Sequence, residues 1–353
     1  MSLGAAAFSL ASRLQAQDAS GEKKLGVALV GLGNYSRGEL GPALRLTKHC
    51  RLAGVVTGDR AKGERWAKDY GFPETSIYGY GTMARMADDP AIDIVYVVTP
   101  NALHAEHTIA AAKAGKHVIC EKPMSVSVAE ADAMIAACRA AKVKLSIGYR
   151  LHFDPLHVEL KRLAQEKTYG PFMRMTGANG FRMGSKVWRA TRALAGGGPL
   201  MDMGIYCVQE ACLAADATPV AVTAREHTKT RPDFFTDVEQ GLDWTMEFAN
   251  GAKAELSTSY DQNYGRFRAE AEKGWLHFEP AFGYRGLKVM THNGPLNLTP
   301  LQSQQAVQMD DFALCVRENR ESRIPGEMGR RDMAIIDAIY AAMKTGKRTE
   351  VKA

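Results

Sequence analysis

Short apolar runs alternate with helix-like segments along the first part of the chain. The runs have the length of buried strands and are LGVALV (25–30), RLAGVVT (51–57), IDIVYVV (92–98), HVIC (117–120) and KLSIGY (144–149). The segments between them, such as AKGERWAKDYG (61–71) and ALHAEHTIAAAKAG (102–115), have helical composition and close on a glycine. Strands that alternate with helices in this way predict a parallel, doubly wound α/β sheet.

The pattern changes after residue 150. Apolar residues at every second position from Leu242 to Phe248 indicate a strand with one buried face, and Asn250-Gly251 then predicts a hairpin turn before a second alternating run. The segment 266–280 has the pattern of another hairpin, and 333–343 has one apolar helical stripe. This half is expected to be an α+β domain built on a large open, mostly antiparallel sheet.

The chain of 353 residues has the length of about two domains. We expect a leader or arm at 1–24, the α/β domain at 25–148, and the α+β domain at 149–353, with its C-terminal helix packing back toward the first domain. The first 17 residues are rich in Ala, Ser and Leu and lack acids. They resemble the end of an export signal without its basic start, which favours a periplasmic location, and the alternative is an unstructured or non-native leader of a cytoplasmic protein.

Composition excludes several kinds of function. The net charge is +6, but the 45 basic residues are scattered and do not form the clustered patch that nucleic acid requires. No run of 18 apolar residues predicts a membrane span. The six cysteines form no CxxC pair, so we expect neither a metal nor a redox site.

A glycine turn after the first strand is the first candidate site. Gly31 and Gly33 allow a tight turn and a close approach of the backbone to a pyrophosphate at a helix N-terminus. Ser36 replaces the third glycine of this fingerprint but is small enough for close packing. The turn predicts dinucleotide binding, and Asn34 and Tyr35 are assigned to the same site.

The end of the second strand bears on the choice of dinucleotide. An NAD site usually has an acid there for the ribose 2′-hydroxyl, whereas this chain has Thr57 and reaches Asp59 two residues later. The hydroxyl, together with Arg60 and Lys62, suits a 2′-phosphate and hence NADP. The alternative is that both cations are solvated charges at the start of a helix.

Polar residues also follow the later strands, on the sheet edge where ligands bind in this architecture. Pro100 and Asn101 follow one strand, and His104 is expected near the nicotinamide ribose. Glu121 and Lys122 end the next apolar run, so both side chains are expected to point into the cleft.

A second cluster of chemical residues lies in GGGPLMDMGIYCV (196–208). The glycine run would let the chain lie close to a ligand, while Asp202 and Tyr206 are four residues apart and share one face of a helix. Facing Lys122, they would form a proton-transfer set, because a cation favours the phenolate of a nearby tyrosine. The alternative is a helix-capping aspartate and a core tyrosine.

The combination of EKP (121–123) with GGGxLxDxGxY (196–206) resembles the glucose–fructose oxidoreductase, inositol dehydrogenase and rhizopine-catabolism family over about residues 25–350. The closest branch is that of glucose–fructose oxidoreductase. The similar stretches are GLGNY, NALHAE, AGKHVICEKPMSVSVA, IGYRLHFDP, LAGGGPLMDMGIY and AIYAAMKTG.

This resemblance implies a Rossmann domain and an open-sheet domain with the substrate between them. It implies that Lys122 contacts substrate and cofactor, and that Asp202 acts with Tyr206, which replaces the histidine of most members as the acid–base group. Thr57 and Lys62 would hold the 2′-phosphate. The remaining cofactor contacts that we assign are Tyr80, Arg150, Trp188 and Arg189.

The expected activity is an NADP-dependent sugar oxidoreductase that transfers hydride between C1 of a cyclic aldose and nicotinamide. The product is an aldonolactone, and the bound NADPH can then reduce a second sugar. The alternatives are a plain NAD(P)-dependent sugar or polyol dehydrogenase with an exchangeable cofactor, and a non-catalytic NADP-binding sensor. The resemblance also implies a homodimer or homotetramer that pairs through the open sheet.

Overall fold

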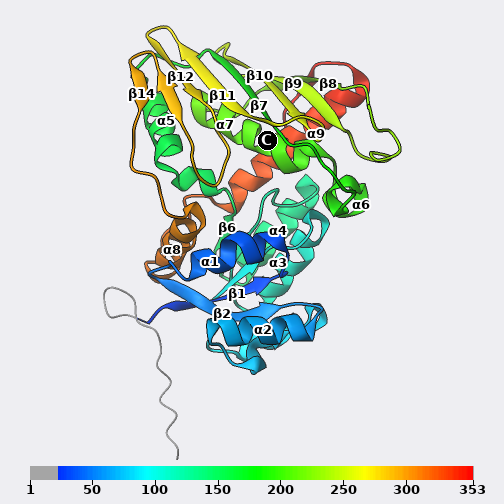
Figure 1. Ribbon diagram of the computed structural model, residues 1–353, viewed down its shortest axis with the longest axis vertical. Coiled ribbons are helices and arrows are strands. Elements are labelled where there is room, and N and C mark those ends of the chain that lie inside the picture. Colours follow the sequence, from blue (N-terminus) through cyan, green and yellow to red (C-terminus); the bar gives the residue numbers. More distant parts are fainter. Residues whose placement is uncertain (1–22, 353) are drawn as a thin grey trace, which may run out of the picture.

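The computed structural model describes residues 23–352, which form two sheets, one above the other in Figure 1. The expected leader at 1–24 lies almost wholly outside the described residues, and so does the segment that resembles an export signal. Within the described part of the chain, no helix combines the length and the apolar character needed to cross a bilayer.

The first sheet has six parallel strands in the order β3-β2-β1-β4-β5-β6. This is the strand order of a doubly wound dinucleotide-binding sheet, so the predicted α/β class is confirmed. The two-residue strand β3 is too short to produce a recognisable pattern and was not predicted. The strands are β1 (Leu25–Val30), β2 (Cys50–Val56), β3 (Ile77–Tyr78), β4 (Ile94–Val97), β5 (His117–Cys120) and β6 (Leu145–Ile147).

Helices cover both faces of this sheet, which explains why its strands are apolar at nearly every position. In β1, Val27 and Leu29 pack into the core beneath α1, α2 and α8, whereas Ala28 and Val30 pack into the core beneath α3 and α4. Helix α8 belongs to the second half of the sequence and returns to the first sheet. These helices are α1 (Gly41–Leu44), α2 (Arg60–Tyr70), α3 (His104–Lys113), α4 (Val128–Ala140) and α8 (Gln304–Arg317).

The second sheet has nine strands in the order β14-β13-β12-β11-β7-β10-β9-β8-β15. Strands β7 and β10 pair in parallel and the other neighbours pair antiparallel, which confirms the expected open, mostly antiparallel sheet. Both predicted hairpins are present, as β9–β10 and β11–β12. The strands are β7 (Arg174–Gly180), β8 (Ala221–Glu226), β9 (Gly241–Glu247), β10 (Lys253–Ser259), β11 (Tyr264–Ala271), β12 (Gly274–Phe278), β13 (Val289–Thr291), β14 (Gly294–Leu296) and β15 (Thr349–Glu350).

The two faces of the second sheet differ. Leu242, Trp244 and Met246 are buried on the face where helices α5, α7 and α9 lie, between the sheet and the first domain (Figure 1). Polar residues such as Thr245 and Glu255 line the opposite face. The remaining helices are α5 (Pro155–Glu166), α6 (Arg192–Ala195), α7 (Ile205–Ala215) and α9 (Gly326–Thr345), and α9 also contacts α4 and β6.

Candidate active site

A cavity of about 520 Å³ lies at the carboxyl edge of the first sheet, where the sequence predicts the dinucleotide. The loops after β1, β2 and β4 form it, and the segment before α6 closes one side. The predicted cofactor residues that line it are Gly31, Gly33, Asn34, Tyr35, Thr57, Lys62, Tyr80, Pro100, Trp188 and Arg189.

The turn after β1 has the shape that a pyrophosphate requires. Gly31 has a φ of +97°, and a Cβ there would lie 3.0 Å from the carbonyl oxygen of Val98. A Cβ on Gly33 would meet no atom within 4 Å, so this residue opens onto the cavity. Ser36 is fully buried and donates a hydrogen bond to the carbonyl of Gly31 at 2.6 Å, which ties the helix to the turn. The residues present therefore fit a nicotinamide dinucleotide.

The two cations that suggested NADP, Arg60 and Lys62, are placed differently after the end of β2. Thr57 accepts a hydrogen bond from the N–H of Asp59, whose carboxylate caps α2 by accepting from the N–H of Lys62. Lys62 lines the cavity, but Arg60 is exposed, pairs with Glu64 and Glu74, and is not among the lining residues. In this structure Arg60 therefore takes the position expected under the alternative, that of a solvated charge at the helix start.

Two residues expected at this edge are buried beneath it. Asn101 donates from its side chain to the carbonyl of Ala195 at 2.9 Å. His104 is 1% exposed, and its ring nitrogens lie 2.8 Å from the carbonyls of Pro123 and Thr99. Burial lowers the pKa of His104 to about 4, although the two carbonyls act in the opposite direction. His104 is therefore a structural residue and not a contact of the cavity, contrary to the prediction.

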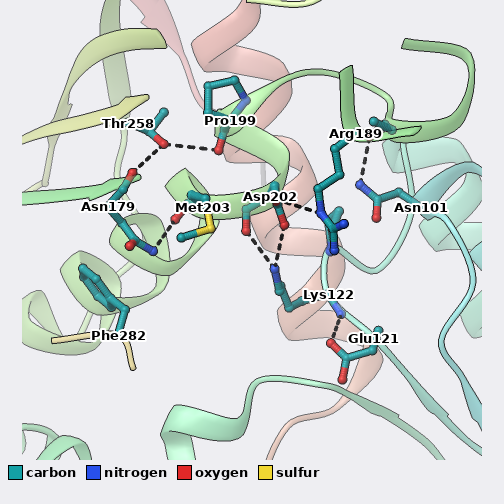
Figure 2. A network of polar contacts seen from close by, with 12 residues as sticks. Asn101, Glu121, Lys122, Asn179, Arg189, Pro199, Asp202, Met203, Thr258 and Phe282 are labelled. Carbon is teal, nitrogen blue, oxygen red and sulfur yellow. Dashed lines mark hydrogen bonds and ion pairs between the residues drawn. The ribbon is translucent and has the colours of Figure 1, made fainter. Parts of the chain in front are cut away.

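Glu121 and Lys122 point in different directions, although both were expected to face the cleft. Glu121 is buried, and its carboxylate accepts from the hydroxyl of Tyr96 at 2.7 Å and from the N–H of Lys122. Burial raises the pKa of Glu121. Lys122 extends instead toward Asp202 (Figure 2), and its bond to Pro123 is cis.

Lys122, Asp202 and Tyr206 lie together, as the two motifs predicted. The Nζ of Lys122 donates to the main-chain carbonyl of Asp202 at 2.7 Å and lies 3.4 Å from Oδ1 of the same residue (Figure 2). It also lies 4.7 Å from the centre of the Tyr206 ring. The contact joins the loop after β5 to the helical segment that precedes α7, so both halves of the chain contribute to the cluster.

The carboxylate of Asp202 has two further partners. Arg189 lies 3.0 Å from Oδ2, and the hydroxyl of Tyr260 donates to the same oxygen at 3.1 Å. Burial alone would raise the pKa of Asp202, but the charges of Lys122 and Arg189 outweigh burial and lower it. Asp202 is therefore ionised and suited to accept hydrogen bonds. Arg189 also lines the dinucleotide cavity, so it connects that cavity to Asp202.

The glycine run packs against the protein itself, whereas the sequence suggested a ligand contact. Gly196 has a φ of +78°. A Cβ on Gly197 would collide with the hydroxyl of Tyr340, and one on Gly198 with the carbonyl of Glu239. The glycines thus let the chain pass closely over these two residues on its way to Asp202.

Two side chains that the sequence did not single out hold this segment. The buried carboxylate of Glu239 accepts from the N–H groups of Gly198 and Leu200 at 2.9 and 3.2 Å. The side chain of Asn179 donates to the carbonyl of Met203 at 3.0 Å (Figure 2). Glu239 and Asn179 have no local motif, and the chain brings them to this segment only when the second sheet forms.

Arg150 was assigned to the cofactor, but it does not line the dinucleotide cavity. It is 3% exposed and donates to the carbonyls of Phe282 and Gly283 at 2.6 and 2.9 Å, and to the side chain of Gln304. Its Cζ lies 5.2 Å from the centre of the Tyr206 ring, and the Nζ of Lys122 lies near the same ring. Among the described residues, no group of three or more His, Cys, Asp or Glu side chains is arranged to bind a metal.

Comparison with known protein families gives two matches that together span most of the chain. Residues 25–149 match the model described as "Oxidoreductase family, NAD-binding Rossmann fold", and residues 157–277 match the GFO/IDH/MocA C-terminal domain. The chain belongs to the GFO/IDH/MocA oxidoreductase family. The family resemblance drawn from the EKP and glycine-rich motifs is therefore confirmed.

Relatives in the GFO/IDH/MocA family include enzymes named for sugars. The aldose-aldose oxidoreductase from Caulobacter crescentus, solved in complex with glycerol, is 40% identical, with a TM-score of 0.90 over 93% of this chain and 100% of that one. The D-xylose 1-dehydrogenase [NADP(+)] of Haloarcula marismortui is 30% identical over 90% of this chain and 91% of its own length. A levoglucosan dehydrogenase structure, 21% identical with a TM-score of 0.80 over 94% of this chain and 100% of that one, shares the fold.

Proposed function

We propose that the protein is an NADP-dependent aldose oxidoreductase that oxidises C1 of a cyclic aldose to an aldonolactone. The observation that carries the proposal is the cluster of Lys122, Asp202 and Tyr206, which Arg189 connects to the dinucleotide cavity. The similarity to the aldose-aldose oxidoreductase, at 40% identity over nearly the whole chain, supports the sugar class.

The turn of Gly31 and Gly33 would hold the pyrophosphate of the cofactor, with Trp188 and Arg189 against its exposed side. When bound, the nicotinamide ring supplies the hydride acceptor. Thr57 and Lys62 place a hydroxyl and a cation at the end of β2 without an acid in the usual NAD position, which supports NADP. The name of the Haloarcula relative, with NADP(+), agrees with this choice.

Side chains of the protein would transfer the proton that accompanies the hydride. Tyr206 takes the proton of the C1 hydroxyl during oxidation and returns one to the carbonyl oxygen during reduction. Lys122 favours the phenolate form of Tyr206 and donates a hydrogen bond to a sugar hydroxyl. Asp202, kept ionised by Lys122 and Arg189, accepts from another hydroxyl and orients the ring. Reduction of a second aldose by the same groups would complete an aldose-to-aldose cycle.

A spectrum and mass analysis of the purified protein, followed by a panel of aldoses, tests the proposal. We expect bound NADP(H) and an aldose-dependent change in nicotinamide absorbance, with a lactone as product. Turnover by a protein that is purified free of nucleotide would favour the plain dehydrogenase with exchangeable cofactor. Tight NADP binding without turnover of any aldose would favour the non-catalytic sensor.

A further inference from the structure

Arg150 is a buried cation whose partners are all neutral. Its guanidinium donates to the carbonyls of Phe282 and Gly283 and to the side-chain oxygen of Gln304. No carboxylate among residues 23–352 forms an ion pair with it, and its buried Nε has no hydrogen-bond partner there. A buried charge without a counter-charge is costly, so such a residue is expected to face a group that becomes negative.

The groups beside Arg150 that can become negative are chiefly phenols. Its Cζ lies 5.2 Å from the centre of the Tyr206 ring and 4.3 Å from that of Tyr284. Burial alone would lower the pKa of Arg150, but Tyr206, Tyr35 and Tyr284 outweigh this effect and raise it, so the side chain stays charged. The charge of Arg150 also lowers the pKa of Glu121. The hydrogen bonds of that carboxylate, however, come from the hydroxyl of Tyr96 and the N–H of Lys122.

Arg150 is also held in one position. The side-chain amide of Gln304 donates to Asp154 at 2.9 Å, which fixes the amide so that its oxygen faces Arg150. Asp154 is in turn fixed as the N-cap of α5, where it accepts from the N–H of Leu156. The ring of Tyr206 therefore has two cations near it, Lys122 from β5 and a rigidly held Arg150.

We infer that Arg150 is a positioning residue for the proposed proton transfer, a second fixed cation that stabilises the phenolate of Tyr206. The inference rests on the proposed function and replaces the assignment of Arg150 to the cofactor. Lys122 would then be free to bond the sugar and Asp202, while Arg150 supplies a constant positive charge that substrate binding does not disturb. Its effect should appear in the pH dependence of turnover.

Other titratable groups also surround Tyr206. Lys122 and Asp202 lie at its substrate side, Tyr35 and Tyr284 interact with it, and a small cavity behind it is lined by His152, His157 and Glu210. Burial lowers the pKa of His152 to about 4 and raises that of Glu210 to about 7. Of His152 and Glu210, only Glu210 therefore titrates near neutral pH, so the pH profile needs a control in which Glu210 is replaced.

The experiment is the pH profile of kcat/KM for aldose oxidation in wild type, Arg150→Lys and Arg150→Gln. Activity rises with pH as the base forms. We expect Arg150→Gln to move this rise to higher pH by roughly 1 unit or more, because the variant removes a cation whose Cζ lies 5.2 Å from the centre of the Tyr206 ring. Arg150→Lys keeps the charge, so its rise should stay within about half a unit of wild type. Arg323→Gln is the matched control, since Arg323 also lies over an aromatic ring, Phe153, but is half exposed.

An unchanged rise in Arg150→Gln, with activity lost only through unfolding or weaker NADP binding, would overturn the inference and leave the proposed function intact. Wild-type protein without aldose turnover would overturn both. If Arg150→Gln does not fold, Gln304→Leu releases the guanidinium from one of its acceptors and should shift the rise in the same direction by less. The shift caused by Arg150→Gln should persist in a Glu210→Gln background, and its disappearance there would assign the titration to Glu210.

Discussion

Lys122 directly follows the buried strand β5 and Glu121, and its ammonium is bonded to a carbonyl 80 positions further along the chain. This placement makes its removal a test of mechanism. We expect Lys122→Ala and Tyr206→Phe each to lower kcat by about 10²–10⁴, the usual range for acid–base groups. The double variant should lose far less than the product of the two effects, because the residues act as a unit.

The measurement that accompanies these rates is the melting temperature of the same preparations. The Lys122 side chain is only 12% exposed, but Arg189 still pairs with Asp202 when Lys122 is removed, so we expect a small loss of stability. If Asp202 only caps a helix and Tyr206 is only a core residue, the opposite result is expected for stability and activity. Melting temperatures would then fall while activity per folded molecule survived.

Cofactor choice is also decided by single residues. Lys62→Ala should weaken NADP binding by roughly 1.5–3 kcal/mol, the value of a hydrogen bond to a charged group, and leave NAD binding nearly unchanged. Arg60→Ala is the matched control, because Arg60 lies on the same helix but pairs with Glu64 and Glu74 away from the cavity. Calorimetric titration of both nucleotides measures these effects. Equal affinity of the wild type for NAD and NADP would contradict the prediction.

At the scale of single residues, the sequence predicts the site residues that belong to motifs. It does not predict the residues that contact them from distant parts of the chain. Lys122, Asp202 and Tyr206 stand out because their neighbours in the chain are distinctive. Tyr260 bonds to Asp202 from 58 positions away, and nothing around it indicates this. The strand-end pattern equally cannot separate Lys122 from Glu121, because a single backbone rotation decides which side chain turns inward.

At the scale of elements, the strands and helices of the first sheet follow from their apolar patterns, because parallel strands that are buried on both faces form nearly continuous apolar runs. The antiparallel hairpins follow from Asn250-Gly251 and from alternation. The parallel pairing of β7 with β10 could not be predicted, since a crossover leaves no local pattern. The close packing of the glycine run could not be predicted either, because its neighbours Tyr340 and Glu239 are remote in the sequence.

The contact between α5 and α7 gives a prediction about stability. Burial raises the pKa of Glu210 to about 7, although His157 lies only 3.4 Å away. A carboxyl whose folded pKa exceeds its unfolded value stabilises the fold fully below the unfolded value and loses this contribution as pH rises through the folded one. Relative to Glu210→Gln, wild type should therefore lose on the order of 3 kcal/mol between about pH 4 and 8.

Chemical unfolding of both proteins across this pH range measures the difference. Glu166→Gln on the same helix pair is the control, since Glu166 is exposed and pairs with Arg162 at the surface. Its stability relative to wild type should hardly change with pH. A constant difference between wild type and Glu210→Gln at all pH values would show that folding does not raise the pKa of Glu210.

At the scale of the whole molecule, the site depends on both sheets. Lys122 comes from the loop after β5, whereas Asp202 and Tyr206 come from the segment that precedes and opens α7. The division of the chain into two kinds of sheet follows from the change of hydrophobic period near residue 150. The way the parts meet does not, because α8 and α9 return to the first sheet from the far end of the chain.

The open face of the second sheet leads to the last prediction. In the described chain, the helices lie on the other face (Figure 1), and this face carries Arg225, Asp243, Glu255 and Arg266 around a shallow hollow of about 590 Å³. In an interface related by a two-fold axis the same patch meets itself, so a charged patch is self-complementary when it carries both signs of charge, as this face does. We therefore expect a homodimer or homotetramer paired through this sheet.

Sedimentation at micromolar concentration should give a multiple of the monomer mass. Thr245→Arg, in the middle of the face, should shift the protein toward monomer, whereas Lys113→Glu on the exposed side of α3 should not. A wild-type monomer at these concentrations would refute the pairing.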